Sequence, residues 1–522
     1  MFDRGSGILF PIFSLPSKFG IGCFSKEAKE FVDFLKESGQ TYWQILPIGP
    51  TGYGDSPYQP DSAFAGNPYF ISPEKLIEDA LLTWDEANAV SFGDNLEKVD
   101  YGALYENRKP LLKKAFARWK EKKEEEKAYE RFLEKESFWL KDYALYVAIK
   151  SSEKGASWLE WPKPLRERDK EALREAEVKF KEEMEFVYFQ QYLFHTQWHE
   201  LLKYAHEQGI QIIGDLPFYV ALDSADAWSH PESFRTDTTG KPAEVAGCPP
   251  DAFSADGQLW GNPVYDWEAI KKTNYRWWIH RIKRNYEFYD VIRFDHFHGF
   301  CQYYSISWGE TSAKKGAYHP GPGMDFFRVL KAELGELKMI AEDLGTVTEE
   351  NTKLLADSGL PGMKVLQFAF TSWDSVYVTH RHERNCVVYT GTHDNTPTRA
   401  WVEEIGEGDR GYTRRYLNSM NSDYGQLTWD MIREAYRSVA DTCIIPLQDY
   451  LCKGREARIN TPGKAADNWQ WRLLPNFLSK DLSRSIRELS DLYGRTPRPK
   501  ETAPGKKENE KENEIEETEE NS

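Results

Sequence analysis

The chain has 522 residues, enough to bury a large core, and its 40% hydrophobic and 29% charged residues are an ordinary balance for a globular protein. Its formal net charge is −17, from 67 basic and 84 acidic residues, and an acidic surface repels phosphate groups. We therefore expect neither nucleic acid nor a membrane as a partner. Six widely spaced cysteines without a CxxC pair indicate neither a zinc site nor a disulfide framework.

Eight short apolar runs recur along the chain, and each is typical of a strand buried on both faces of a parallel sheet. They lie at residues 7–13, 42–48, 210–216, 291–296, 338–343, 363–370, 386–392 and 443–447. Helical patterns such as 25–38 and 196–208 lie between them, and this alternation predicts helical crossovers. Eight strands close a (β/α)8 TIM barrel, the α/β fold that we expect. A doubly wound open sheet is the alternative, but no glycine-rich phosphate loop follows the first run.

The spacing of these runs is uneven. Residues 49–209 separate the second run from the third, and their helical patterns carry an apolar face. A loop-rich stretch of 70 residues, 221–290, precedes the fourth run. A barrel needs about 250 residues, so the excess predicts insertions. We expect one barrel domain over residues 1–499, with a helical insertion at about 61–205 and a loop insertion at about 221–288.

The last 23 residues, 500–522, contain nine glutamates, four lysines and almost nothing apolar. Such a segment cannot bury enough surface to offset its ordering entropy, so we predict a disordered acidic tail. No apolar run has the length of a membrane span, and Pro11 breaks the stretch 8–15, which makes it a poor signal peptide. We expect a cytoplasmic protein; a plastid protein whose transit peptide was removed is the alternative.

Four of the predicted strands end in an acid: Asp215, Asp295, Glu342 and Asp394. Active sites of barrel enzymes are built from the carboxyl ends of several strands, which share one rim. The alternative is that each acid only caps the helix that follows it. Four acids with flanking arginine and histidine at one rim favour a catalytic site.

Clustered carboxylates suit glycoside chemistry, in which one stabilises or attacks the anomeric carbon and another, protonated, donates to the leaving oxygen. Metal binding is the rival use. His296 and His298 are two residues apart in a strand and could chelate, but the chain has no HExxH motif. We predict no metal. A serine nucleophile is disfavoured because the chain has no GxSxG motif.

Aromatic and polar residues alternate in three loops, at 52–67, 248–265 and 468–472. Proline, glycine and asparagine predict fixed turns there. One explanation of these aromatic and polar residues is ordinary loop packing. The functional interpretation is sugar binding, in which the apolar face of a pyranose stacks on a ring while polar side chains bind its hydroxyls.

Nine motifs follow one another between Gly5 and about Arg472. They are RGSGILFPIFSLPS, GDSPYQ, SAFAGNPY, GDLPFYVA, FSADGQLWGNPVY, RFDHF, AEDLG, PGMKVLQFAF and GTHDN. Together they resemble the amylomaltases, or disproportionating enzymes, which are the 4-α-glucanotransferases of glycoside hydrolase family 77. The chain departs from the family pattern at His298, at Thr396–Pro397 and in a shortened loop at residues 371–380. None of these departures is one of the three acids that the resemblance makes catalytic.

The resemblance implies roles for individual residues. Asp295 would be the nucleophile, Glu342 the general acid/base and Asp394 the third carboxylate, which distorts the sugar. Arg293 beside Asp295 would keep it ionised. The substrate-binding residues would be Ser56, Tyr58, Asp215, Asp251, Phe253, Gln258, Trp260, Arg293, His393 and Asn468. The loop insertion would close over the glucan.

The resemblance also implies the reaction. We expect transfer of segments of α-1,4-glucans to the 4-hydroxyl of an acceptor glucan or glucose, by a retaining double displacement, without a metal or organic cofactor. An amylase-type hydrolase with the same acids and a catalytically silent glucan-binding protein are the alternatives. We expect a monomer or a weak homodimer.

Overall fold

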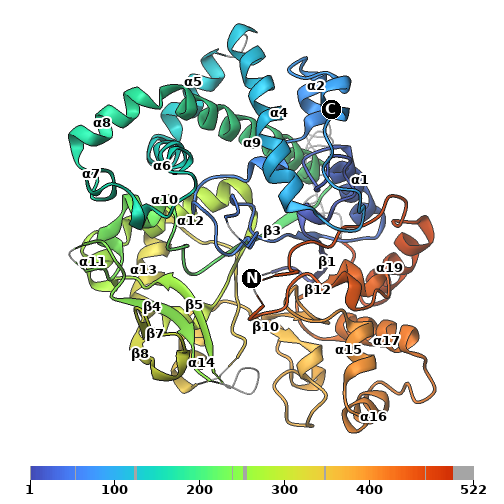
Figure 1. The fold of residues 1–522 in the computed structure, drawn as a ribbon. Coiled ribbons are helices and arrows are strands. Elements are labelled where there is room, and N and C mark those ends of the chain that lie inside the picture. The colour runs from blue at the N-terminus through green and yellow to red at the C-terminus, as the bar shows by residue number, and fades with distance from the viewer. Residues whose placement is uncertain are drawn as a thin grey trace, which may run out of the picture.

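The computed structural model describes residues 2–52, 54–122, 126–237, 239–250, 256–345, 348–464 and 466–497. The predicted acidic tail lies outside them. All eight predicted strands are present and belong to one parallel sheet (Figure 1). They are β1 (Gly5–Leu9), β2 (Tyr42–Gln44), β3 (Gln211–Leu216), β6 (Val291–Phe294), β9 (Met339–Ala341), β10 (Gly362–Val365), β11 (Cys386–Tyr389) and β12 (Thr442–Pro446).

The sheet closes on itself. Its strands are hydrogen-bonded in the order β10-β11-β12-β1-β2-β3-β6-β9. The two strands at the ends of this order also meet, because the N–H of Ala341 in β9 donates to the carbonyl of Pro361, just before β10, at 2.9 Å. The predicted (β/α)8 barrel is therefore confirmed, and the open-sheet alternative is wrong.

The barrel strands are buried on both faces, as the apolar runs predicted. Close packing leaves no room for a side chain at Gly214 in β3, where an added Cβ would lie 2.1 Å from the ring of Tyr289. The indole of Trp43 in β2 is fully buried, and its N–H donates to the carbonyl of Phe10 at 2.7 Å. Burial of this polar group is thus compensated by a hydrogen bond.

Helices follow or flank most barrel strands. The predicted helix at 25–38 is α1 (Lys26–Glu37), which starts after Ser25 and buries Phe31 and Leu35. The helices from residue 276 onward are α12 (Arg276–Phe288), α13 (Gly323–Leu334), α14 (Glu349–Ser358), α15 (Thr398–Glu404), α16 (Glu407–Tyr416), α17 (Tyr424–Arg437), α18 (Leu447–Tyr450) and α19 (Lys480–Leu492).

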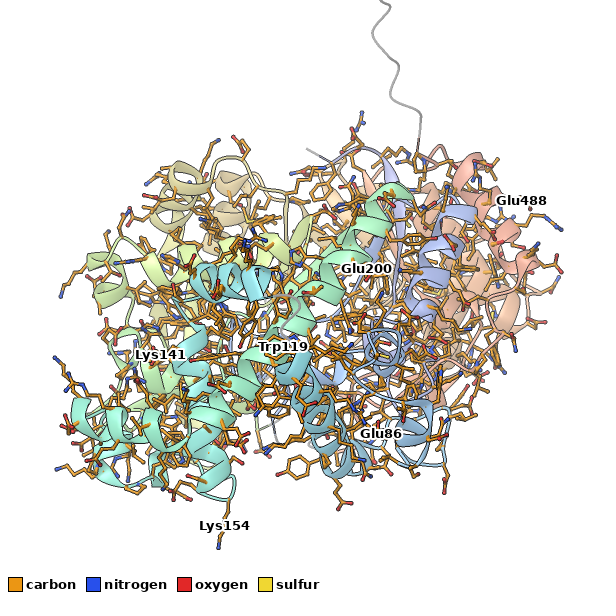
Figure 2. The ribbon with its side chains drawn as sticks, turned by 90° about the horizontal axis from the view of Figure 1, so that it is seen from above. Glu86, Trp119, Lys141, Lys154, Glu200 and Glu488 are labelled. Carbon is orange, nitrogen blue, oxygen red and sulfur yellow. The ribbon has the colours of Figure 1, made fainter. Side chains whose placement is uncertain are left out.

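The chain between β2 and β3 forms a group of helices. They are α2 (Pro73–Glu78), α3 (Trp84–Asn88), α4 (Tyr101–Lys122), α5 (Glu126–Lys135), α6 (Leu140–Ser152), α7 (Lys163–Arg166), α8 (Lys170–Lys179) and α9 (Lys181–Glu207). Helix α9 connects them to the barrel. Its Glu200, labelled in Figure 2, binds Lys29 of α1 and Lys75 of α2, each at 2.8 Å. Trp119 of α4 packs on Phe189 of α9 at 5.2 Å. The domain boundaries themselves stay a prediction.

A second, antiparallel sheet lies beside the barrel (Figure 1). Its strands, in the order β5-β4-β7-β8, are β4 (Glu244–Cys248), β5 (Gln258–Pro263), β7 (Gln302–Ser307) and β8 (Ala317–Pro320), and short helices α10 (Ala225–Ser229) and α11 (Trp267–Lys272) flank the first pair. Residues 221–288 were predicted as a loop insertion, and this sheet was not predicted. Glycine or proline occurs in β4, β5 and β8, and β4 pairs with β7, which follows the barrel strand β6 in the sequence, so no local pattern revealed the pairing.

Within the part of the chain that the structure describes, no helix has both the length and the apolar character needed to span a membrane.

Candidate active site

The four predicted acids stand at the carboxyl ends of barrel strands. Asp215 lies in β3, Asp295 directly follows β6, and Glu342 directly follows β9; these three strands are neighbours in the sheet. Asp394 follows β11. The register pairs Asp215 with Arg293 across β3 and β6, so their side chains emerge on the same side. Strand register therefore places Asp215 and Arg293 side by side at the rim of the barrel.

Arg293 is the centre of this group and is 3% exposed. Its Nη1 donates to both carboxylate oxygens of Asp215, at 2.8 and 2.7 Å, and to Asp295 Oδ1 at 3.2 Å. The hydroxyl of Tyr58 donates to Asp215 Oδ2 at 2.8 Å. Asp215 thus neutralises most of the buried guanidinium charge and fixes the side chain that faces Asp295.

Asp295 is held in a strongly electrostatic environment. Burial raises the pKa of this carboxyl, Arg293 lowers it, and Asp215, Glu342 and Asp394 raise it further. Each of these three acids lies near enough to Asp295 for its charge to act on that carboxyl. The Asp295 side chain itself remains 28% exposed, so a ligand can reach it. Arg293 lowers the pKa of Asp295, but burial and the neighbouring acids outweigh it, and the net pKa is raised well above its usual value. That Arg293 keeps Asp295 ionised therefore stays a prediction.

Glu342 is fixed by two backbone groups. The N–H of His296 donates to Oε2 at 2.8 Å and the N–H of Leu344 to Oε1 at 3.1 Å. His296 adopts a left-handed backbone conformation, with φ of 49°, in the turn that follows β6. Burial raises the pKa of Glu342 to about 6, against the opposing effect of Arg293. A carboxyl with this pKa is partly protonated near neutral pH and can donate a proton.

Asp394 is held by residues that the sequence analysis missed. The Asn460 side-chain amide donates to Asp394 Oδ1 at 2.6 Å, and Arg458 donates to the Asp394 carbonyl at 2.8 Å. Both come from the loop after α18, more than 60 residues along the chain. No local motif marked them, because their partners are defined only when this loop returns to the rim.

Aromatic rings form one wall beside the acids. Tyr58 stacks on His393 with ring centroids 5.2 Å apart and an angle of 13° between the planes. Trp469 tilts against Tyr58 at 5.7 Å. Burial lowers the pKa of His393, so its ring is neutral near pH 7. The 468–472 loop was singled out for its aromatics, yet Trp469 itself was not predicted as a site residue.

The second sheet brings another ring to the cleft. The edge of Trp260 in β5 meets the ring of His296 at 5.0 Å, with 88° between the planes. The indole N–H of Trp260 donates to Gln258 Oε1 at 3.1 Å, and Gln59 donates to the Trp260 carbonyl at 3.4 Å. Two predicted binding residues, Asp251 and Phe253, lie outside the described residues.

Two further predicted binding residues make contacts within their own loops. The N–H of Tyr58 donates to Ser56 Oγ at 3.3 Å. Asn468 accepts from the N–H of Thr461 at 2.9 Å and donates to the carbonyl of Lys464 at 2.9 Å. Both ends of the Asn468 amide therefore hold the last loop. Its role in binding substrate stays a prediction.

A separate cluster has the residue types of a metal site. Atoms of Glu136, His195 and Glu287 that could bind a metal lie within 4.8 Å of one another. However, Arg284 Nη1 binds both carboxylates, at 2.9 and 2.6 Å, and Lys135 binds Glu287 at 2.9 Å. A metal cation would have to displace these positive charges, so this donor set does not fit one.

The parallel barrel and the acids at its carboxyl rim define the class of the protein as a barrel enzyme with a carboxylate-based active site. Comparison with known proteins gives the family. A profile of the 4-alpha-glucanotransferase family matches residues 10–477. The 4-alpha-glucanotransferases of Clostridium butyricum and Thermus thermophilus are 45% and 43% identical, over 93% and 94% of this chain and 99% of each relative.

A solved structure agrees with these sequences. The amylomaltase from Streptococcus agalactiae in complex with acarbose superposes with a TM-score of 0.92 at 39% identity, over 95% of this chain and all of that one. The chain belongs to the 4-alpha-glucanotransferase family, glycoside hydrolase family 77. The resemblance predicted from the nine motifs is confirmed.

Proposed function

We propose that this enzyme transfers segments of α-1,4-glucans to the 4-hydroxyl of an acceptor glucan or glucose through a covalent glucosyl-enzyme. The observation that carries the proposal is the position of Asp295 and Glu342 at the ends of the paired strands β6 and β9, where Arg293 donates to Asp295 at 3.2 Å and Asp394 lies near enough for its charge to act on Asp295. A retaining mechanism needs a carboxylate nucleophile and a protonated carboxyl of this kind.

In the first step Asp295 attacks the anomeric carbon of the donor. A bond forms from its carboxylate oxygen to that carbon, the bond to the 4-oxygen of the leaving sugar breaks, and the proton of Glu342 passes to that oxygen. The raised pKa of Glu342, about 6, supports its role as the proton donor. Asp394 binds ring hydroxyls and favours the distorted sugar that resembles the transition state.

In the second step an acceptor sugar replaces the leaving fragment. Glu342, now ionised, removes the proton of the acceptor 4-hydroxyl, whose oxygen attacks the anomeric carbon and releases Asp295. Transfer exceeds hydrolysis only where the acceptor is bound better than water. The rings of Tyr58, Trp469 and Trp260 support this by giving a sugar apolar surfaces to cover.

The products formed from maltotriose test the proposal. We expect glucose together with a ladder of maltooligosaccharides longer than the substrate, and no products from the Asp295→Asn enzyme used as a control. Only shorter sugars from the unaltered enzyme would instead identify an α-glucan hydrolase and contradict the proposal.

We further propose a cytoplasmic enzyme that is a monomer or a weak homodimer, without a cofactor. A 38% identical relative from Arabidopsis thaliana is named as chloroplastic/amyloplastic, which is the plastid alternative to this proposal. Light scattering over a range of protein concentrations measures the oligomeric state, and a mass that stays at a tetramer or larger would contradict it.

A further inference from the structure

Arg458 makes three hydrogen bonds at the back of the third carboxylate. Its Nε donates to the carbonyl of Asn460 at 2.7 Å, its Nη1 to Thr396 Oγ1 at 2.7 Å, and its Nη2 to the carbonyl of Asp394 at 2.8 Å. The planar guanidinium thus connects the last loop to the loop after β11. A flexible lysine could not reach three acceptors in such fixed directions.

Arg458 does this without a salt bridge to any carboxylate of the described residues, since its three acceptors are two carbonyls and a hydroxyl. Its neighbour Arg455 is different, because it pairs with Glu404 at 2.6 Å and is 64% exposed. Burial and the charge of Arg455 lower the pKa of Arg458, and the charges of Asp394 and Glu404 oppose that shift. The hydrogen bonds of Arg458, in contrast, go only to the loops that carry Asp394 and Asn460.

The contacts around Arg458 form a closed set. The N–H of Asn460 donates to the carbonyl of His393 at 3.1 Å, and the Asn460 side chain donates to Asp394 Oδ1 at 2.6 Å. Arg458 binds the carbonyls of both Asn460 and Asp394. Both members of the Asn460–Asp394 pair are consequently fixed through their backbones as well as through the side-chain bond.

We propose that Arg458 is a positioning residue for glucan transfer, which fixes the Asn460–Asp394 pair from behind and so sets where the Asp394 carboxylate meets the sugar ring. This inference rests on the proposed role of Asp394. It predicts a loss in kcat more than a rise in KM, because the contacts of Asp394 strengthen when the sugar is distorted. A displacement of about 1 Å costs about a hundredfold in rate.

The test compares Arg458→Ala with Arg455→Ala, the matched control in the same loop. With maltotriose we expect kcat to fall about a hundredfold in Arg458→Ala, with KM changed far less, and no change in the control. Added guanidinium ion should restore activity to Arg458→Ala in a saturable manner, whereas equal concentrations of sodium should not. Thr396→Val, which removes one of the three acceptors, should show a smaller fall in kcat.

Several results would overturn the inference. Unaltered kcat in Arg458→Ala, or a loss that guanidinium does not restore and that accompanies a lowered Tm, would show a merely structural role. If Arg458→Ala fails to fold, unaltered kcat in a folded Thr396→Val enzyme would contradict the inference. Asp394→Asn is measured in parallel: unaltered transfer by that variant would instead contradict the proposed function, whatever Arg458 does.

Discussion

The acids at the rim are held in two different ways. Asp295 and Glu342 follow directly from adjacent strands, and their partners, Arg293 and the His296 N–H, belong to the same segment of chain. Asp394 instead depends on Asn460, from a loop more than 60 residues away. The first arrangement is fixed by barrel register, and the second requires that distant loops return to the rim. We call Asp295 and Glu342 with their partners the strand-held part of the site, and Asp394 with Asn460 the loop-held part. The two parts should respond differently to mutation.

The largest effect is expected in the strand-held part. Asp215→Ala removes the main partner of the buried Arg293, and leaving a buried charge unpaired costs about 3–5 kcal/mol. Because Asp295 remains a partner of Arg293 at 3.2 Å, we expect the lower end of that range together with loss of transfer. Chemical denaturation measures the free energy of unfolding. Asp481→Ala, at an exposed salt bridge on α19, is the control and should match the unaltered enzyme.

An Asp215→Ala enzyme as stable as the control would show that the Asp215–Arg293 pair does not organise the strand-held part. The strand-held part would then have no stabilising ion pair that distinguishes it from the loop-held part.

The pH dependence of the reaction tests the role of Glu342 in the strand-held part of the site. Burial raises the pKa of Glu342 to about 6. The proton donor must be protonated in the free enzyme, so kcat/KM for maltotriose should fall roughly tenfold per pH unit above about pH 6. A maltosyl fluoride donor needs no proton for its leaving group, so its first step should lack this fall. A kcat/KM for maltotriose that stays level to pH 8 would contradict the role of Glu342.

The smallest effect is expected at Trp260, where the second sheet lies beside His296. Trp260→Ala removes a ring that adjoins His296, and stacked aromatic contacts contribute about 0.5–1.5 kcal/mol, so KM for long glucans should rise up to roughly tenfold. Trp308→Ala, a 45% exposed residue just after β7 of the same sheet, is the control and should leave KM unchanged. Equal KM values in the two variants would show that Trp260 does not bind the glucan.

The same comparison explains what the sequence could predict. The eight strands were found because runs such as Cys386–Tyr389 are apolar on both faces, and the acids because they end such runs. The second sheet was missed because β4 contains Gly247 and its partner β7 comes only after the barrel strand β6 in the sequence, so the pairing is not local. Arg458, Asn460 and Trp469 were missed because their function comes from tertiary contacts and not from a local pattern.

The role of Asp295 as nucleophile is the central claim, and covalent trapping tests it most directly. In the Glu342→Gln enzyme, maltosyl fluoride can still react, because fluoride leaves without a proton donor, but the second step lacks its base. We expect mass spectrometry of the digested protein to find a maltosyl group on the peptide that contains Asp295. A maltosyl group on another carboxylate, or unmodified protein that still releases fluoride at the unaltered rate, would contradict the account.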